Sequence, residues 1–546
     1  MAGLDGQWNS RRSPIYARNG MVACSQPLAA EAGLSILKKG GNAADAAVAV
    51  AAALNVTQPT STGMGGDAFA LYFDAKTKQV RGINGSGRCP SGLSIDKLEE
   101  LGYSEENRPV SSSPLWITVP GAPATWVETI EKLGSGKLHL LDVLSPAISL
   151  AENGYPVNVI TAHGWKNSER LLQTASPNGG EMLLDGRAPE AGEIMRMPTL
   201  AESFRELALK GKAGYYEGRI AQAIVDVIQQ TGGVMSLEDL KNHVNTEDTP
   251  IHVNYRGVDV YEMPPNGQGI TALLALNILE AFDLTGLKHN SPEHLHLVIE
   301  SLRVAFADTL YYVADPAFAN VPIDGLISKE YAAERRRLIS LDYAAGNIDH
   351  GFPPNTANTV YFCVVDGDGN ACSFINSNYQ GFGTGIVPKG CGFTLQNRGA
   401  NFLLDRNHAN GLEPGKRPYH TIIPGLALKN GELFCPLGVM GGYMQPQGHL
   451  QVLSNMIDFQ MGPQQALDAP RICIDGVQTS GDILLEDGIT EETQQKLADL
   501  GHRNPRIISG WGRQDFGTGQ IVVRDPLSGV LCAGSDPRQD GLAIGW

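Results

Sequence analysis

Two β-rich regions enclose a long helical stretch, and this order constrains the fold more than any single motif. Strand patterns follow the Gly-rich segment near residue 63 and return after residue 359, whereas residues from about 120 to 350 read as mostly helical. The segment 294–315, HLHLVIESLRVAFADTLYYVAD, carries the helical period clearly. This order predicts an α+β protein in which sheets from both halves of the chain pack into one sandwich.

Local signals set several boundaries. Residues 27–58 predict an amphipathic helix that ends at Gly40-Gly41 and a small-residue helix capped by Asn42, whose alanine surface lets another element pack closely. Two strands joined at DAKTKQ (74–79) follow. Further helices are expected near 446–460 and 490–500.

Length and composition exclude several classes of protein. The chain has 546 residues, so two lobes or one large interlocked domain are expected. A net charge of −16 argues against nucleic acid or an anionic membrane surface as the main partner. The Ala-rich run 43–56 is too short to span a bilayer, and the first residues lack the order of a signal peptide, so a cytoplasmic location is expected. Eight scattered cysteines, with no C-x-x-C pair, predict buried small side chains rather than zinc or disulfides.

Thr359 opens the hairpin pattern TVYFCVVDGDGNACSF, directly after a segment without helical or strand periodicity. Thr favours strands on its own account, so a purely structural role is the common reading of such a position. The alternative is chemical. If the 358–359 bond were cut, the freed α-amine of Thr359, with a pKa of roughly 7.7–8.0, would serve as the base for its own hydroxyl.

Other candidate motifs favour ordinary structure. The glycines of GMGGD (63–67) and PPNGQG (264–269) lack the spacing of nucleotide-binding loops and predict tight turns with close backbone packing. The histidines show no H-E-x-x-H pattern, so no metal site is expected. No G-x-S-x-G elbow is present, which disfavours a serine hydrolase of that type.

The chain resembles the γ-glutamyltransferase family of N-terminal-nucleophile hydrolases over nearly its whole length. The stretches that carry the resemblance are GGNAADAAVAVAAALNVTQPTSTGMGGDAF, VPGAPATW, PPNGQG, RVAFADTLYYVADP, the hairpin at 359, GFGTGIV, KRPYHTIIPGL, VMGGYMQPQG and AGSDPRQDG. The resemblance implies a four-layer αββα sandwich and self-cleavage between Asn358 and Thr359. It also implies a large chain 1–358 and a small chain 359–546, which stay intertwined as a heterodimer that further association could enlarge, and it implies no cofactor.

The same resemblance assigns the catalytic roles. Thr359 corresponds to the nucleophile of both self-cleavage and catalysis, and Ser377 to the hydroxyl residue that bonds it. Gly441 and Gly442 of VMGGYM correspond to the glycine pair whose amides form the oxyanion hole. Glycines suit that role because their backbone approaches an oxyanion closely.

The expected substrate pocket departs from the glutamyl-specific pattern. Ser86 stands where those members have the arginine that holds the substrate α-carboxylate, and Arg88 follows two residues later. Asn401 replaces the aspartate that holds the α-amino group, which removes the charge that attracts an ammonium ion. Arg398 stands in place of a glutamine, and His420 and Thr421 in place of a serine pair. The candidate substrate-binding residues are therefore Arg88, Arg398, Asn401, His420 and Thr421.

These observations predict a self-processing threonine amidohydrolase that acts on a small-molecule amide through an acyl-threonine intermediate. A γ-glutamyl compound such as glutathione is the first substrate expected, for hydrolysis and for transfer. A small carboxylate-bearing amide such as oxamate, or a glutaryl or cephalosporin-type acyl amide, is the alternative. An inactive homologue that acts as a binding protein is the alternative of another class, which the presence of Thr359, Ser377, Gly441 and Gly442 disfavours.

Overall fold

Two large antiparallel sheets form the centre of the protein. The computed structural model describes residues 12–346, 359–476 and 481–546. The sheet named here the β13 sheet has the order β1 (Ile15–Ala17), β18 (Leu531–Ser535), β17 (Thr518–Arg524), β13 (Glu432–Met440), β12 (Gly425–Lys429), β9 (Val258–Glu262) and β8 (Ile251–Tyr255). The β10 sheet has the order β19 (Leu542–Gly545), β2 (Gly20–Cys24), β10 (Val360–Asp366), β11 (Ala371–Ser377), β3 (Asp67–Asp74), β4 (Gln79–Gly85) and β7 (Thr246–Asp248).

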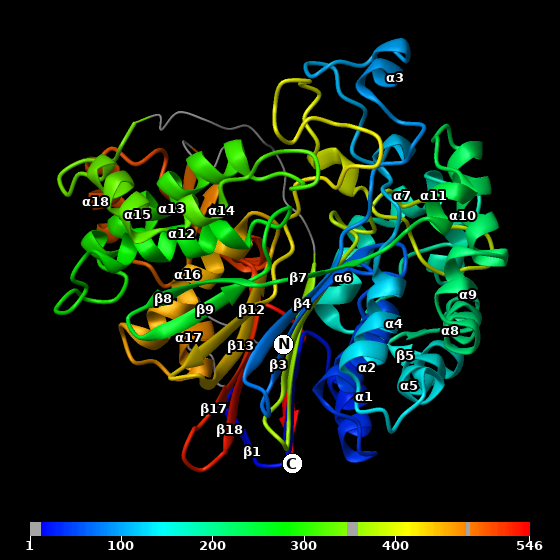
Figure 1. Cartoon of the computed structure of the whole chain (residues 1–546), viewed down its shortest axis with the longest axis horizontal. Coiled ribbons are helices and arrows are strands. Elements are labelled where there is room, and N and C mark those ends of the chain that lie inside the picture. Colours follow the sequence, from blue (N-terminus) through cyan, green and yellow to red (C-terminus); the bar gives the residue numbers. More distant parts are fainter. Residues whose placement is uncertain (1–11, 347–358, 477–480) are drawn as a thin grey trace.

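Both sheets combine strands from before and after residue 359. In Figure 1 the yellow-green β10 and β11 lie beside the blue β3 and β4, and the green β8 and β9 lie beside the orange β12 and β13. Neither half of the chain therefore builds a complete sheet.

The two sheets face each other at close range. Strand β10 packs against β13 and β17, and a Cβ built on Gly438 would lie 2.5 Å from the ring of Tyr361. Because no side chain fits at that position, Gly438 allows the Tyr361 ring to pack against β13. The two inner faces thus share one interface without a gap at this point.

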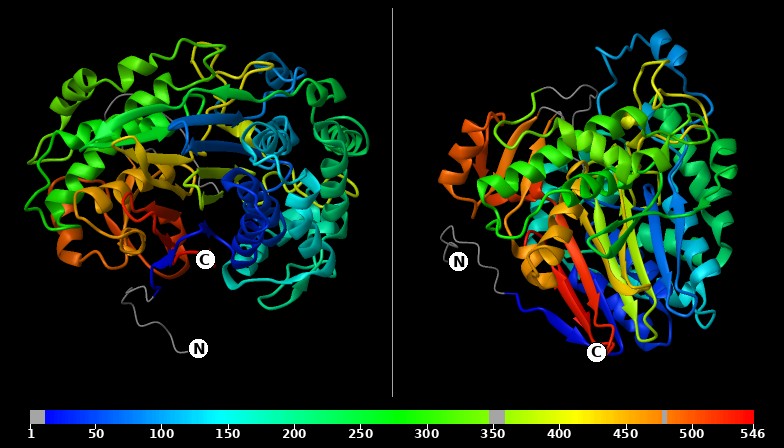
Figure 2. Two further views of the ribbon diagram at one scale, coloured as in Figure 1. Left: turned by 60° about the horizontal axis from the view of Figure 1, so that its bottom comes forward. Right: turned by 60° about the vertical axis from the view of Figure 1, so that its left-hand side comes forward.

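Helices cover the outer face of each sheet (Figures 1 and 2). On the β10 sheet lie α1 (Pro27–Lys38), α2 (Ala43–Thr57) and α4 (Ala122–Leu133), with α5 (Leu140–Asn153) and α8 (Pro198–Lys210) outside them. On the β13 sheet lie α12 (Gly269–Glu280) and α16 (Met444–Ile457), with α13 (Pro292–Tyr312) packed on α12.

Shorter elements complete the chain. The helices are α3 (Ile95–Glu100), α6 (Val159–Asn167), α7 (Glu169–Thr174), α9 (Lys212–Tyr216), α10 (Arg219–Gln230), α11 (Leu237–Lys241), α14 (Ile323–Leu326), α15 (Lys329–Arg335), α17 (Pro463–Asp468) and α18 (Glu491–Asp499). The 3₁₀ turns are η1 (Pro114–Trp116), η2 (Gly179–Met182), η3 (Arg336–Leu338), η4 (Arg398–Asn401) and η5 (Gly510–Phe516). The remaining strands are β5 (Tyr155–Pro156), β6 (Ile194–Met195), β14 (Ile472–Asp475), β15 (Asp482–Glu486) and β16 (Arg506–Ile508). None of the helices in the described ranges combines the length and the apolar character that a transmembrane span requires.

The predicted local signals are confirmed at the start of the chain. The side chain of Asn42 accepts hydrogen bonds from the amides of Ala44 and Asp45, which makes it the N-cap of α2. A Cβ built on Gly33 would lie 2.5 Å from Val50, so α1 and α2 pack with almost no space between them. Helices α13, α16 and α18 and the strand pair β3–β4 also lie where the sequence predicts them.

One part of the middle region differs from the expectation. Strands β7, β8 and β9 lie within the stretch that reads as mostly helical. Buried residues alternate with exposed ones in IHVNY and with half-buried ones in VDVYE, as a half-buried strand requires. The segments are only five residues long, and the helical patterns around them obscure this short period.

Candidate functional site

Thr359 lies directly before β10 and is almost completely buried, with 2% of its surface exposed. In the hairpin Val360 of β10 pairs with Asn376 of β11. Because the strands are antiparallel, the residue before Val360 lies beside the residue after Asn376, which brings Thr359 beside Ser377. Oγ1 of Thr359 lies 3.1 Å from Oγ of Ser377. The hairpin therefore positions both hydroxyl groups where β10 begins and β11 ends, in the middle of the β10 sheet. Asn358, the other residue of the expected cleavage bond, lies outside the described residues.

Ser377 is held by two N–H donors in addition to its contact with Thr359. The amide of Tyr379 donates to Ser377 Oγ at 2.8 Å, and Nη2 of Arg398 donates to the same oxygen at 3.1 Å. A hydroxyl oxygen accepts such bonds through its lone pairs. In the contact with Thr359, either hydroxyl group can be the donor.

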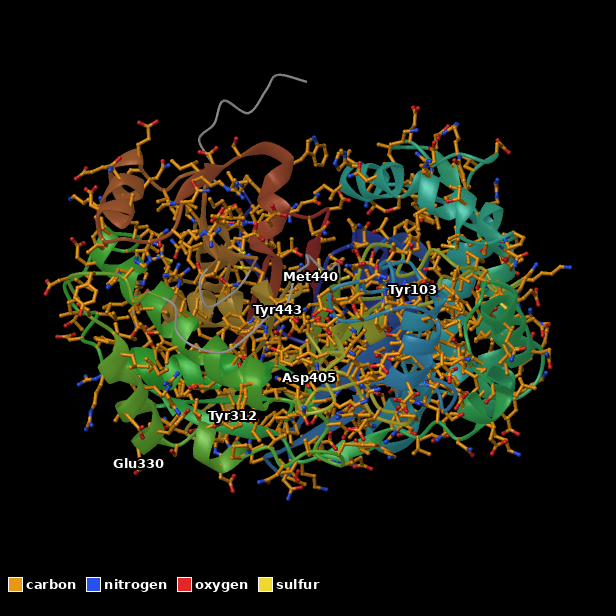
Figure 3. All side chains as sticks on the ribbon, turned by 90° about the horizontal axis from the view of Figure 1, so that it is seen from above. Tyr103, Tyr312, Glu330, Asp405, Met440 and Tyr443 are labelled. Carbon is orange, nitrogen blue, oxygen red and sulfur yellow. The ribbon has the colours of Figure 1, made fainter. Side chains whose placement is uncertain are left out.

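A glycine pair directly follows β13. Gly441 and Gly442 have φ values of +134° and +61°, which L-residues with a side chain rarely adopt. No acceptor among the described residues takes the amide hydrogen of either glycine. Met440 and Tyr443, which flank the pair, lie near the centre of the molecule when it is seen from above (Figure 3).

Gln268 fixes the orientation of this glycine loop. Its side-chain amide donates to the carbonyl of Gly442 at 2.8 Å and to the carbonyl of Thr421 at 2.6 Å. One buried side chain thus joins the glycine loop to the segment that carries His420 and Thr421.

Arg398 is the positive charge nearest to the hydroxyl pair. It is fully buried, donates from Nη1 to Thr421 Oγ1 at 2.6 Å, and stacks with its guanidinium 4.4 Å from the ring centre of Tyr379. Burial lowers the pKa of Arg398 to about 10, and Asp67 partly offsets that shift, so the group stays charged at neutral pH.

Arg398 differs from most of the buried arginines because no carboxylate in the described part of the chain lies within ion-pair distance of it. Of the six arginines buried in the described ranges, four lie within 3.4 Å of a carboxylate oxygen. A buried guanidinium without a nearby anion is costly. The four paired residues are Arg303, Arg471, Arg513 and Arg538, and the two without a carboxylate within ion-pair distance are Arg398 and Arg417.

Asp67 connects the other groups around the site. One carboxylate oxygen accepts from the amides of Gly87 and Gly121 and from Gln396, and the other accepts from Nε2 of His420 at 3.0 Å. Burial, together with the charge of Arg398, lowers the pKa of His420 to about 3, so this imidazole is neutral at neutral pH. His420 therefore contacts Asp67 as a neutral ring.

The remaining predicted residues have different surroundings. Nδ2 of Asn401 donates to the carbonyl of Tyr419 at 3.0 Å, which ties η4 to the segment before His420. Arg88 is half-buried, and its guanidinium donates to the carbonyl of Val244 at 2.9 Å. The structure thus brings Thr359, Ser377, Arg398 and Thr421 into one chain of contacts, to which Arg88 does not belong.

Sequence reasoning missed Asp67 and Gln268, although both lie in motifs that it singled out. The reading of GMGGD as a turn with close backbone packing is confirmed, since a Cβ on Gly66 would lie 2.3 Å from the carbonyl oxygen of Ser377. The signal in the sequence is a polar residue within each Gly-rich motif. Asp67 ends GMGGD, and Gln268 stands between the glycines of PPNGQG. Among the described residues, no three His, Cys, Asp or Glu side chains gather as metal ligands would.

Two packed antiparallel sheets with a buried threonine at the start of a central strand agree with the class of amide hydrolases that use an N-terminal nucleophile. A sequence model of the family described as Gamma-glutamyltranspeptidase matches residues 29–546. The chain belongs to this family and is one of its amide hydrolases.

Individual relatives differ in what their names state. The chain is 40% identical to the glutathione hydrolase-like YwrD proenzyme of Bacillus subtilis, over 96% of this chain and 98% of the relative. It is 33% identical to the acylase ACY 1 proenzyme of Pseudomonas sp. strain V22, over 98% of this chain and 94% of the relative. The crystal structure of cephalosporin acylase from Bacillus halodurans superimposes with a TM-score of 0.92 and 42% identity, over 100% of this chain and 99% of that one.

Proposed function

We propose that this chain is a self-processing N-terminal threonine amidohydrolase whose substrates carry a carboxylate on the acyl group. The observation that carries the proposal is the contact chain from Thr359 Oγ1 through Ser377 Oγ to the guanidinium of Arg398, which no carboxylate of the described residues approaches within ion-pair distance. The helix–sheet–sheet–helix order supports the αββα sandwich of N-terminal-nucleophile hydrolases, and the proenzyme names of the relatives support processing.

Processing begins with attack of Thr359 Oγ1 on the carbonyl carbon of residue 358. The peptide bond is replaced by an ester, and water then hydrolyses this ester to release the chains 1–358 and 359–546. Each sheet contains strands of both chains, hydrogen-bonded to one another, so the products stay together as a heterodimer. Cytoplasmic location and any further association of this heterodimer stay predictions.

Catalysis uses the same hydroxyl. The new α-amine of Thr359 takes the hydroxyl proton as the oxygen attacks the substrate amide, and the amides of Gly441 and Gly442 bind the oxyanion. The amine then leaves with a proton, which gives an acyl-threonine ester, and water resolves that ester to the acid. The hydrogen bond between Ser377 and Thr359 orients the attacking oxygen during both steps.

Arg398 anchors the acyl group through its carboxylate. The guanidinium is charged, buried and close to Ser377, and Thr421 holds its other arm. Asn401 stands at the position where glutamyl-specific members bind the substrate α-amino group. Because its side chain is neutral, this position lacks the negative charge that would attract an ammonium group. Glutaryl-type acyl amides are therefore favoured over γ-glutamyl amides such as glutathione, which remain the second candidate.

Kinetics on matched substrates tests this proposal. We expect kcat/KM for a glutaryl amide to equal or exceed that for the γ-glutamyl amide with the same leaving group. Arg398→Gln should lower both by about 10- to 100-fold, as loss of a charge-assisted hydrogen bond predicts. Arg88→Gln is the control and should stay within twofold. A wide preference for glutathione, with no effect of Arg398, would contradict the proposed pocket.

A further inference from the structure

Tyr379 follows Ser377 by two residues and has a backbone conformation that a bulky residue rarely adopts. Its φ is +76°, in the left-handed region, and only 2% of its surface is exposed. A bulky side chain strains the backbone there, and the conformation persists only where the surrounding structure holds it. Because such strain gathers at functional sites, the contacts of Tyr379 indicate what the strain provides.

Hydrogen bonds on both sides of Tyr379 hold this conformation. The carbonyl of Asn378 accepts from the amide of Asn397 at 3.4 Å, and the amide of Gln380 donates to Oδ1 of Asn397 at 3.2 Å. Nδ2 of Asn397 also donates to Oε1 of Gln380 at 2.7 Å. Asn397 directly precedes Arg398, so these bonds tie the backbone of Tyr379 to that of Arg398.

The strained conformation brings both the backbone and the ring of Tyr379 into the site. Its amide donates to Ser377 Oγ at 2.8 Å, and that oxygen lies 3.1 Å from Oγ1 of Thr359. The guanidinium carbon of Arg398 lies 4.4 Å from the centre of the Tyr379 ring. Tyr379 is thus in direct contact with both residues that link Thr359 to the proposed carboxylate anchor.

The ring gives Arg398 a favourable contact that uses none of its hydrogen-bond donors. The negative face of an aromatic ring attracts a desolvated cation, which offsets part of the cost of burying the guanidinium. A carboxylate would offset the same cost, but it would accept from the N–H groups and neutralise the charge. Here Nη1 donates to Thr421 and Nη2 to Ser377, and Nε has no acceptor among the described residues. The guanidinium therefore retains N–H groups for a further anion.

We propose that Tyr379 is a positioning residue that determines specificity, because its ring holds the Arg398 guanidinium in place for the carboxylate of the acyl group. The inference rests on the proposed function and names the residue on which its carboxylate anchor depends. Tyr379 does not touch the reacting atoms and acts through Arg398. The bond to Ser377 comes from the backbone, so it survives removal of the ring. Loss of the ring should therefore weaken binding of carboxylated substrates and spare the chemical step.

The test compares two substrates that differ only at the end of the acyl chain. Glutaryl p-nitroanilide ends in a carboxylate, and valeryl p-nitroanilide ends in a methyl group at the same place. We expect Tyr379→Leu to raise KM for the glutaryl substrate about tenfold or more, with little change in kcat, because a desolvated cation–π contact is lost. KM for the valeryl substrate should stay within about twofold, since it has no carboxylate to bind. Tyr379→Phe keeps the ring and should behave like wild type.

Phe382→Leu is the matched control for strain and burial. Phe382 lies in the same loop, is fully buried and has φ +55°, but its ring centre lies 5.6 Å from that of Trp165 in the apolar core. Thermal unfolding should show a loss of stability in both leucine variants, whereas KM for the glutaryl substrate should rise only in Tyr379→Leu. Tyr379→Met, which has no ring but a longer side chain, repeats the test if Tyr379→Leu does not fold. A similar rise of KM in Phe382→Leu would assign the effect to packing and overturn the inference.

Binding of glutarate, the acid that hydrolysis would release, separates this inference from the proposed function. Isothermal titration calorimetry should show binding to wild type and to Tyr379→Phe, and about tenfold or more weaker binding to Tyr379→Leu. If no amide is hydrolysed but glutarate binding depends on the ring in this way, the proposed function fails and the inference stands. If Arg398→Gln impairs hydrolysis while Tyr379→Leu leaves both KM and glutarate affinity unchanged, the function stands and the inference is overturned. Wild type that does not bind glutarate would also overturn the inference.

Discussion

The carboxylate of Asp67 accepts a hydrogen bond from Nε2 of His420 at 3.0 Å, and both side chains are fully buried. The other oxygen of Asp67 accepts from three further donors, so the carboxylate has no freedom to rotate. The amide of Ile422 approaches Nδ1 of His420 at 3.4 Å, which makes Nδ1 the acceptor and Nε2 the donor. These two contacts thus fix the tautomer of His420.

Asp67→Asn should destabilise the protein by about 2–3 kcal/mol and lower kcat/KM for carboxylated substrates. The single oxygen of an asparagine can accept either from the three donors or from His420. The NH₂ group then faces at least one N–H donor, with which it cannot form a hydrogen bond. Denaturant unfolding of Asp67→Asn, His420→Gln and the double variant measures the coupling between these two residues. We expect a coupling of at least about 1 kcal/mol, and strictly additive losses would show that the contact contributes nothing.

The purified wild-type protein should consist of two chains that meet between Asn358 and Thr359. The physical reason is that the α-amine base exists only after this bond is cut. Thr359→Ala lacks the hydroxyl and should stay uncut and inactive, whereas Thr359→Ser should retain part of both reactions. Intact-mass spectrometry and N-terminal sequencing measure the cut. A stable, uncut and fully active wild-type chain would rule out this mechanism.

Gly442→Ala should lower kcat by one to three orders of magnitude with a smaller effect on KM, because an oxyanion donor acts mainly in the transition state. An alanine at φ +61° also strains the backbone, which costs on the order of 1 kcal/mol of stability. Gly431→Ala is the matched control, since Gly431 has φ +76° and open space around it in the β12–β13 turn.

Gly431→Ala should show a similar loss of stability with unchanged kcat. Steady-state kinetics and thermal unfolding of both variants separate catalysis from strain. A loss of kcat in Gly442→Ala that is matched by Gly431→Ala would assign the effect to folding alone.

The sequence could predict the parts of this site that depend on local structure. The hairpin places Thr359 beside Ser377 because strand alternation and the Asp-Gly turn determine the pairing of neighbouring strands. It could not predict that Asp67 meets His420, 353 positions away, because that contact depends on how a strand of the β10 sheet packs against a loop of the β13 side. The hairpin β8–β9 was missed for another reason, since five-residue strands give a weak period beside long helices.

His294 should make the protein less stable as the pH falls below neutral. Burial, with a smaller contribution from His289, lowers the pKa of His294 to about 3, because the buried ring resists charging and its Nε2 has no partner among the described residues. In the unfolded chain the pKa returns to about 6.5. Between pH 6.5 and pH 3 the unfolded state therefore binds a proton that the folded state does not, and the free energy of unfolding falls by about 1.4 kcal/mol per pH unit.

At pH 5 the protonation of this residue in the unfolded chain should lower the free energy of unfolding by about 2 kcal/mol relative to pH 7. Other buried groups titrate as well, so the measurement compares wild type with His294→Asn at each pH. The asparagine oxygen still accepts from the amide of Asn290, which bonds to Nδ1 of His294 at 3.2 Å, but it binds no proton in this range. From pH 7 to pH 5 we expect the free energy of unfolding of wild type to fall by about 2 kcal/mol more than that of His294→Asn. A difference that stays constant over this range would mean that His294 accepts its proton in the folded protein.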